Sequence, residues 1–414
     1  MIGFDDPGTF RGQLQRGRGV AVRRAPGESG AADVVFECVI VDARWDRQTE
    51  VRDGYLAGLI RGLGLSVVPL AERLDAIAGE DPDDILLVLE VLARLLVAGR
   101  EDAATVLRRY VAGGRHWGAA LNAVTFVNSR RVPDGWEDLV DVALACHSDD
   151  ELQDIVDNGD DSWMRTLLDQ RSPRRSWQRV NALYERAGEL EQAVASGAEY
   201  RNWLRTLADV PRDDLLHQVT SDAARRRWAL EELGRRGDTV VLDLVEDPAL
   251  RNPAGWIPGA PQALEHLGTL AVPRARGWLA GAGAGAGDSP SDVAPSDVAM
   301  TELGLRVLAT SGDLTDAPVL LSALTGAFDD DDQWCFAEIP AQGLGRLQVA
   351  EAAPLLVAAW EQSVHSRARG SFLTALESCA PRSSQVEALA DEGLDDCEPT
   401  VQQLARTIGS RPRT

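Results

Sequence analysis

The chain has 414 residues with 65 acidic and 42 basic side chains, a net charge of −23, and no lysine, so every basic residue other than five histidines is an arginine. This acidity disfavours nucleic acids, whose phosphates need net neutralisation, and anionic membranes, whereas it favours a protein partner, and in particular a basic one. The length is large for one globular core and predicts several domains or an array of repeats.

The N-terminal part of the chain gives mixed signals. Residues 1–32 are rich in Gly and Arg and are interpreted as a flexible N-terminal arm, with one short strand around Val20–Val22 as an alternative. The stretch 33–45 has a β-branched content typical of strands, but its place before a helical pattern favours a helix. Asp46 precedes apolar residues at four-residue steps, so we expect it to be the N-cap of the next helix.

The longest apolar run, ILLVLEVLARLLV at 85–97, predicts a buried helix. It is too short and too charged to span a bilayer, because it contains Glu90 and Arg94, which we expect to pair at i, i+4. The first 24 residues lack an apolar run, so no signal peptide and no membrane association are expected. Five scattered cysteines without a CxxC motif are typical of reduced thiols in the cytoplasm. They are Cys38, Cys146, Cys335, Cys379 and Cys397.

The segment 150–236 differs in charge from the rest of the chain. Between 155 and 236 there are 14 arginines and 14 acidic residues, and tryptophans alternate with the arginines. Trp and Arg are the residue types that anchor protein contacts, and Arg with aromatics also suits nucleic-acid bases and phosphates. In the alternative interpretation each Trp packs between helices and each Arg pairs with an Asp. The candidate partner-binding residues are Trp163, Arg165, Trp177, Trp203, Arg205, Arg226 and Trp228.

The stretch 222–247, DAARRRWALEELGRRGDTVVLDLVED, predicts two antiparallel helices joined by a turn at Gly237, where a left-handed residue ends a helix. Degraded copies follow at 263–279, 305–321 and 341–357, and they place Gly234, Gly268 and Gly345 at one position and Pro318 and Pro354 at the start of second helices. Such hairpins bury little alone, but they form a continuous core when stacked as repeats.

This pattern resembles the HEAT-like (armadillo-type) repeat family, whose repeat reads roughly V-R-x-x-A-A-x-A-L-G before a polar turn and a Pro-bearing leucine helix. The matching residues are Arg226, Ala229, Leu233 and Gly234, and near the C-terminus Asp396, Pro399, Val401 and Ala405. Arg225 stands where Val is usual, and Gln402 where Arg is usual. The resemblance implies an all-α fold, an α-solenoid or superhelix of antiparallel two-helix repeats, over 33–279 and 298–410.

Two segments interrupt this pattern, and a tail follows it. The Ala-Gly alternation and the duplicated PSDVA of 280–297 predict a flexible surface loop, and 411–414 form a tail. The acidic run FDDDDQW at 328–334 is interpreted as a solvated turn, since it lacks the alternating ligands, the Gly and the distal Glu of a calcium loop.

No catalytic, metal-binding or cofactor-binding motif is present. The five histidines stand alone, Cys146 and His147 point apart in a helix, and there is no G-x-S-x-G or phosphate-binding G-x-x-x-x-G-K. We therefore expect a non-catalytic scaffold or adaptor that binds a macromolecule, in the first place a protein, on a concave face. The alternative is a DNA-acting enzyme of the HEAT-like alkylpurine glycosylase type, which needs a basic concave face with Trp and Asp, two residue types that 163–228 offers. The net charge, the absence of lysine and the length all count against this alternative.

Overall fold

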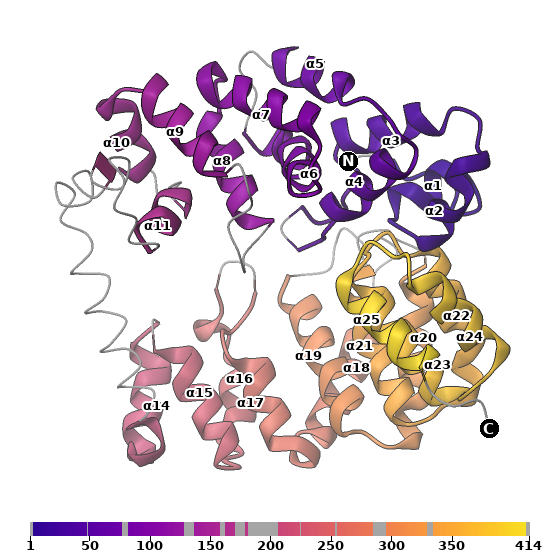
Figure 1. Cartoon of the computed structure of the whole chain (residues 1–414). Coiled ribbons are helices and arrows are strands. Elements are labelled where there is room, and N and C mark those ends of the chain that lie inside the picture. Colours follow the sequence, from indigo (N-terminus) through magenta and orange to yellow (C-terminus); the bar gives the residue numbers. More distant parts are fainter. Residues whose placement is uncertain are drawn as a thin grey trace. The chain divides into compact units, whose positions relative to one another are not determined.

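The computed structural model describes most of the chain, and every regular element in the described part is helical (Figure 1). The described residues are 3–47, 49–76, 82–127, 136–157, 162–169, 179–180, 206–223, 225–252, 255–284, 295–328 and 334–410. No strand occurs within these ranges, which confirms the all-α prediction. The chain divides into two compact units, Met1–Ser196 with Glu392–Gln403 and Gly197–Asp391 with Leu404–Thr414.

The first unit contains short helices at its start and longer ones after residue 85. Its elements are α1 (Phe10–Gln15), α2 (Gly19–Arg24), η1 (Ala25–Gly27), α3 (Ala31–Ile40), α4 (Asp53–Gly62), α5 (Val68–Ala76), η2 (Pro82–Asp84), α6 (Leu86–Val97), α7 (Glu101–Gly113), α8 (Trp117–Phe126), α9 (Trp136–Cys146), α10 (Asp149–Asp157) and α11 (Ser162–Asp169).

The N-terminal residues take part in this unit. The Gly- and Arg-rich sequence of 1–32 predicts a flexible arm, whereas the structure has α1, α2 and η1 within these residues. The hydroxyl of Thr9 caps α1 by accepting a hydrogen bond from a backbone N–H of the first turn, and Phe10 and Leu14 are buried. The alternative of a strand around Val20–Val22 is wrong, because these residues lie in α2.

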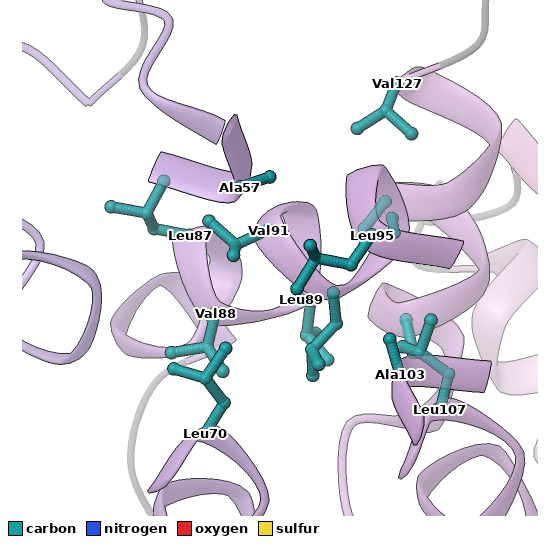
Figure 2. Packing of buried hydrophobic residues seen from close by; sticks show 14 of the residues in the cluster. Ala57, Leu70, Leu87, Val88, Leu89, Val91, Leu95, Ala103, Leu107 and Val127 are labelled. Carbon is teal, nitrogen blue, oxygen red and sulfur yellow. The ribbon is translucent and has the colours of Figure 1, made fainter. Parts of the chain in front are cut away.

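Helix α6 lies at the centre of the first unit's core and packs on α4, α7 and α8. Eight of its twelve residues are buried, as the apolar run 85–97 predicts for a core helix. Figure 2 shows Val88 directed toward Leu70 of α5 and Val91 directed toward Ala57 of α4. This helix therefore holds its neighbours around one shared apolar centre.

The prediction that Asp46 caps a helix is wrong. Its carboxylate instead accepts hydrogen bonds from the backbone N–H of Thr49 at 3.3 Å and from the Thr49 hydroxyl at 2.8 Å. Such a local side-chain turn competes with helix formation, and α4 begins only at Asp53. The residues between α3 and α4 thus form an irregular segment.

The second unit is built of helices paired with short 3-10 turns. Its elements are η3 (Leu207–Asp209), α14 (Arg212–Ser221), α15 (Arg226–Arg235), α16 (Val240–Glu246), η4 (Pro248–Leu250), α17 (Ala260–Leu267), η5 (Gly268–Leu270), α18 (Val272–Ala284), α19 (Pro295–Ser311), η7 (Leu314–Asp316), α20 (Ala317–Gly326), α21 (Trp334–Arg346), η9 (Ala350–Ala352), α22 (Ala353–Gln362) and α23 (Ala368–Cys379). The last helices, α24 (Ser384–Gly393) and α25 (Pro399–Gly409), contribute residues to both units.

Alternate helices pack on each other along the second unit. Helix α15 packs on α17, α17 on α19, α19 on α21, and α21 on α23. Glycines permit two of these contacts: a Cβ on Gly234 would lie 2.3 Å from the carbonyl oxygen of Ala263, and one on Gly345 would lie 2.7 Å from Cα of Ala375. Gly268 differs from these two, because it ends α17 with a φ of 58°.

The turns of the predicted hairpins also follow the sequence pattern. Gly237 has a φ of 71° just after α15, as expected for a left-handed residue that ends a helix. Pro318 and Pro354 lie in the first turns of α20 and α22, where proline leaves no hydrogen bond unmade.

Arginine side chains connect helices of the second unit that pack on each other. Arg346, at the end of α21, donates hydrogen bonds to the carbonyls of Ala309, Leu308 and Gly312 at the C-terminal end of α19, at 2.7 to 3.2 Å. Arg236 donates likewise to three carbonyls around η3. Carbonyls at the end of a helix are only partly satisfied within it, and these guanidinium groups give them additional hydrogen bonds from a packed neighbouring helix.

Three predicted segments lie wholly or partly outside the described residues. The interior of the predicted loop 280–297 lies outside them, although its described flanks are helical, since α18 reaches Ala284 and α19 begins at Pro295. The acidic residues 329–333 and the tail 411–414 also lie outside.

Candidate functional site

A cavity of about 490 Å³ lies within the first unit. Its walls come from the irregular segment between α3 and α4, from the beginnings of α4 and α6 with η2, and from α8 and the first residue of α11. The lining residues are Arg44, Arg47, Thr49, Glu50, Val51, Asp53, Asp83, Leu86, Glu90, Asn122, Ala123, Phe126 and Ser162.

Arg44 is a buried side chain of this cavity. Its Nε and Nη2 donate to the two carboxylate oxygens of Asp42 at 2.8 and 2.7 Å, which makes a bidentate pair. Asp42 has a φ of 51°, a left-handed conformation that Asp adopts more readily than most residues. This turn after α3 brings the guanidinium of Arg44 back onto the carboxylate two residues earlier.

Glu90 faces the same guanidinium from α6. Nη1 of Arg44 donates to Oε2 of Glu90 at 3.3 Å, and Arg94 donates to Asp53 at 2.5 Å. The predicted i, i+4 pair of Glu90 with Arg94 is therefore wrong. Both side chains instead pair with charged groups on neighbouring segments. Ion pairs that are shielded from water are stronger than ion pairs along an exposed helix face.

Burial raises the pKa of Glu90 to about 7. Arg44 and Arg94 lower this pKa, while the carboxylates of Asp53 and Asp42 raise it further. The charged form of a carboxyl is disfavoured where water is excluded and negative charges are near. Near neutral pH, the cavity wall therefore holds a carboxyl that is partly protonated.

A second buried arginine, Arg52, lies behind the cavity wall. It donates to the carbonyl oxygen of Gln15 at 3.2 Å and to Oε2 of Glu50 at 3.3 Å, and it contacts the thiol of Cys397. These contacts join the irregular segment between α3 and α4 to α1 and to the C-terminal residues of the same unit. The cavity wall is thus supported from behind by residues far apart in the sequence.

The cavity lining also includes apolar side chains. Val51, Leu86 and Ala123 contribute aliphatic surface, and Phe126 stands at the C-terminal end of α8. Phe126 is 72% exposed, the highest value among the large hydrophobic side chains of the described residues. A cavity that combines apolar surface with a few polar groups is typical of small-ligand sites.

The structure divides the predicted partner-binding residues between the two units. In the first unit, Trp163 is fully buried and meets Trp117 edge-on, with ring centroids 6.0 Å apart. Its backbone N–H donates to the amide oxygen of Asn122 at 3.0 Å. Arg165 is exposed on α11. Trp163 therefore contributes to the core in this conformation, while Arg165 is accessible.

In the second unit, Arg226 begins α15 and donates to the carbonyls of Val219 and Leu250 at 2.8 and 3.0 Å. Trp228 is half-buried, and the guanidinium of Arg227 lies 4.7 Å from the centroid of its ring. Trp177, Trp203 and Arg205 lie outside the described residues. The partner-binding role of the whole set stays a prediction.

The neighbouring Cys146 and His147 have different environments. The ring of His147 stacks on Trp117 with centroids 3.9 Å apart, and its Nε2 lies 2.8 Å from the carbonyl oxygen of Val111, to which it donates. Cys146 is exposed. A histidine held in this way links α9 to α7 and α8 rather than activating the thiol beside it.

The described part of the chain gives two further negative results. It contains no group of three or more His, Cys, Asp or Glu side chains arranged to hold a metal ion. None of its helices combines the length and the apolar character needed to cross a bilayer.

Sequence reasoning missed the cavity because its charged residues come from distant segments. Arg44 and Glu90 are 46 residues apart, and neither belongs to a motif. The available signal was the presence of two charges within the most apolar run of the chain, since a buried charge requires a partner.

Comparison with known protein families, with characterised proteins and with solved structures finds no match to this chain.

Proposed function

We propose that this protein is a HEAT-like α-solenoid that acts as a non-catalytic scaffold or adaptor in the cytoplasm and binds a protein partner. The observation that carries the proposal is the packing of alternate helices, α15 on α17 through to α21 on α23. Stacked two-helix repeats of this kind produce extended surfaces whose common use is macromolecular binding. Such a fold fits many functions, so charge and surface must identify the partner.

The charge of the chain favours a basic protein. The net charge of −23 raises the rate at which positively charged proteins meet it and opposes nucleic acids. Among the candidate contact residues in the described part, Arg165 is exposed, and Arg226 and Trp228 are half-buried. The reduced thiols of Cys38, Cys146, Cys379 and Cys397 accord with the proposed cytoplasmic location.

The test is affinity capture with the full chain from a lysate of its own source organism, with and without nuclease. We expect one or two proteins to be retained after nuclease treatment and to bind the purified chain directly, with an affinity that falls as salt rises. Arg165→Ala and Trp228→Ala should weaken this direct binding, and Arg61→Ala, an exposed arginine on α4, should not.

Two results would overturn the proposal. One is capture of nucleic acid, or of proteins lost on nuclease treatment, which would favour a DNA-acting protein. The other is failure of every captured protein to bind the purified chain directly.

A further inference from the structure

The cavity of the first unit encloses more negative than positive charge. Four carboxylates of this region are almost fully buried, namely those of Asp42, Glu50, Asp53 and Glu90. The buried arginines beside them are Arg44 and Arg52, and two further arginines, Arg94 and Arg47, have 35% and 41% of their side chains exposed. The cavity lining itself contains four carboxylates, those of Glu50, Asp53, Asp83 and Glu90, and two guanidinium groups, those of Arg44 and Arg47. Burying a charge is costly unless an opposite charge compensates it.

The ion pairs show which carboxylate is least compensated. Both oxygens of Asp42 accept from Arg44, Glu50 accepts from Arg52, and Asp53 accepts from Arg94. Glu90 accepts one hydrogen bond from an arginine, from Nη1 of Arg44 at 3.3 Å. Nε and Nη2 of the same guanidinium donate to Asp42 over shorter distances. The cavity therefore contains one carboxylate that shares its cation with another.

We propose that this cavity binds an organic monocation, a guanidinium or primary ammonium group on a short apolar chain, with Glu90 and Asp53 facing the charge and Leu86, Ala123 and Phe126 facing the chain. The site does not depend on the proposed scaffold function. In the free protein a proton on Glu90 relieves the excess negative charge, and the ligand takes over this role when it binds.

The shape and lining of the cavity select this ligand class. A volume of about 490 Å³ lies within the range of roughly 300–1,000 Å³ found for small-molecule sites. Ca²⁺ and Mg²⁺ require six or more oxygen ligands around one point, and the described residues contain no group of three or more His, Cys, Asp or Glu side chains arranged to hold a metal ion. An exposed aromatic ring such as Phe126 attracts organic cations and covers their apolar parts.

Binding should depend on pH through Glu90. The charged groups that face it are Asp42 and Arg44 from the segment after α3, Asp53 from α4 and Arg94 on α6. Helix α8 contributes an amide, Asn122, and no charged group to the lining. The remaining charged lining residues are Arg47 and Glu50, from the segment before α4, and Asp83 of η2. With a pKa of about 7, the ionised fraction of Glu90, and with it the affinity, rises about tenfold between pH 6 and pH 8.

The experiment is calorimetric titration of the full chain with n-butylguanidine, with N-acetyl-arginine methylamide, and with the neutral analogue N-acetyl-citrulline methylamide, at pH 6 and pH 8. We expect at least one of the two cations to bind, about tenfold more tightly at pH 8, and the neutral analogue to bind at least tenfold more weakly. Binding of n-butylguanidine alone would identify a free small molecule as the source. Binding of the blocked arginine would identify a polypeptide side chain.

Three variants test the assignment. Glu90→Gln should lower the affinity at pH 8 at least tenfold and abolish the pH dependence, whereas Glu101→Gln, on the exposed first turn of α7, should leave both unchanged. Phe126→Ala removes an exposed side chain that folding does not need, and it should weaken binding several-fold. Failure of both cations to bind at pH 8, equal binding of the neutral analogue, or unchanged binding by Glu90→Gln and Phe126→Ala would overturn the proposal.

Discussion

The contact between α15 and α17 predicts a large effect for a very small substitution, Gly234→Ala. The new Cβ would lie 2.3 Å from the carbonyl oxygen of Ala263, 2.6 Å from its Cα and 2.8 Å from its carbonyl carbon. Non-bonded carbon atoms normally approach to about 3.5–4.0 Å. All three atoms belong to the backbone of α17, which cannot rotate away as a side chain can, so the two helices must separate by about 1 Å.

The magnitude follows from two opposing effects. Overpacking in a well-packed contact costs about 1–3 kcal/mol, and three backbone clashes place this substitution near 3 kcal/mol. Alanine stabilises a helix by about 1 kcal/mol relative to glycine. The net loss is therefore about 2 kcal/mol, which corresponds to a fall in Tm of roughly 4–8 °C for a unit of this size.

The assay is thermal unfolding of the full chain, with amide hydrogen exchange to locate the effect. Exchange should accelerate in α15 and α17 and stay unchanged in α6 of the first unit. The matched control is Gly277→Ala in α18, where the glycine is exposed and no atom lies within 4 Å of the new Cβ. The control should melt at or slightly above the wild-type temperature. If Gly234→Ala melts at or above wild type as well, the two helices do not approach as closely as described.

Three further predictions concern other parts of the chain. Arg346→Met removes three hydrogen bonds to the end of α19 and should destabilise the protein by about 1–3 kcal/mol, whereas Arg274→Met removes exposed ion pairs and should cost under about 1 kcal/mol in the same denaturation assay. Because the folded-state pKa of Glu90 is raised from 4.5 to about 7, its contribution to stability falls as pH rises between these values. Glu90→Gln should therefore gain stability relative to wild type from pH 5 to pH 8, by less than about 3 kcal/mol. A stability difference that stays constant over this pH range would contradict the raised pKa. From composition, limited proteolysis should cut first within 280–297 and give fragments of about 280 and 120 residues, and a first cut within 85–130 would contradict the predicted segment boundaries.

The sequence was most informative where local pattern decides structure. The apolar run at 85–97 predicted a buried helix, and Pro318 and Pro354 marked the starts of second helices, because helix periodicity and proline chemistry act within a few residues. The same local reasoning fails at Gly268, which sequence position alone grouped with Gly234 and Gly345. Gly234 and Gly345 permit two helices to approach and Gly268 ends a helix, and only the neighbouring helix distinguishes these roles.

The N-terminal residues show a different limit of sequence reasoning. Gly and Arg in 1–32 predict an arm because they provide few apolar side chains for a core. In the structure, Arg18 pairs with Glu392 at 2.9 Å, and Arg16 donates to the carbonyls of Asp5 and Gly12. Arginines therefore provide the anchoring that apolar side chains usually provide, and their partners lie far away in the sequence or on the backbone.

The absence of lysine connects these observations to the cavity. A guanidinium presents five donors in a rigid plane and can serve several acceptors at once, as Arg346 and Arg44 do. Sharing has a limit, however, because each guanidinium carries a single positive charge. Arg44 donates hydrogen bonds to both Asp42 and Glu90. Its single positive charge neutralises only one of these two carboxylates. A buried network built only from such shared arginines accumulates negative charge where carboxylates outnumber them, and this physical condition makes the cavity of the first unit attractive to a cation.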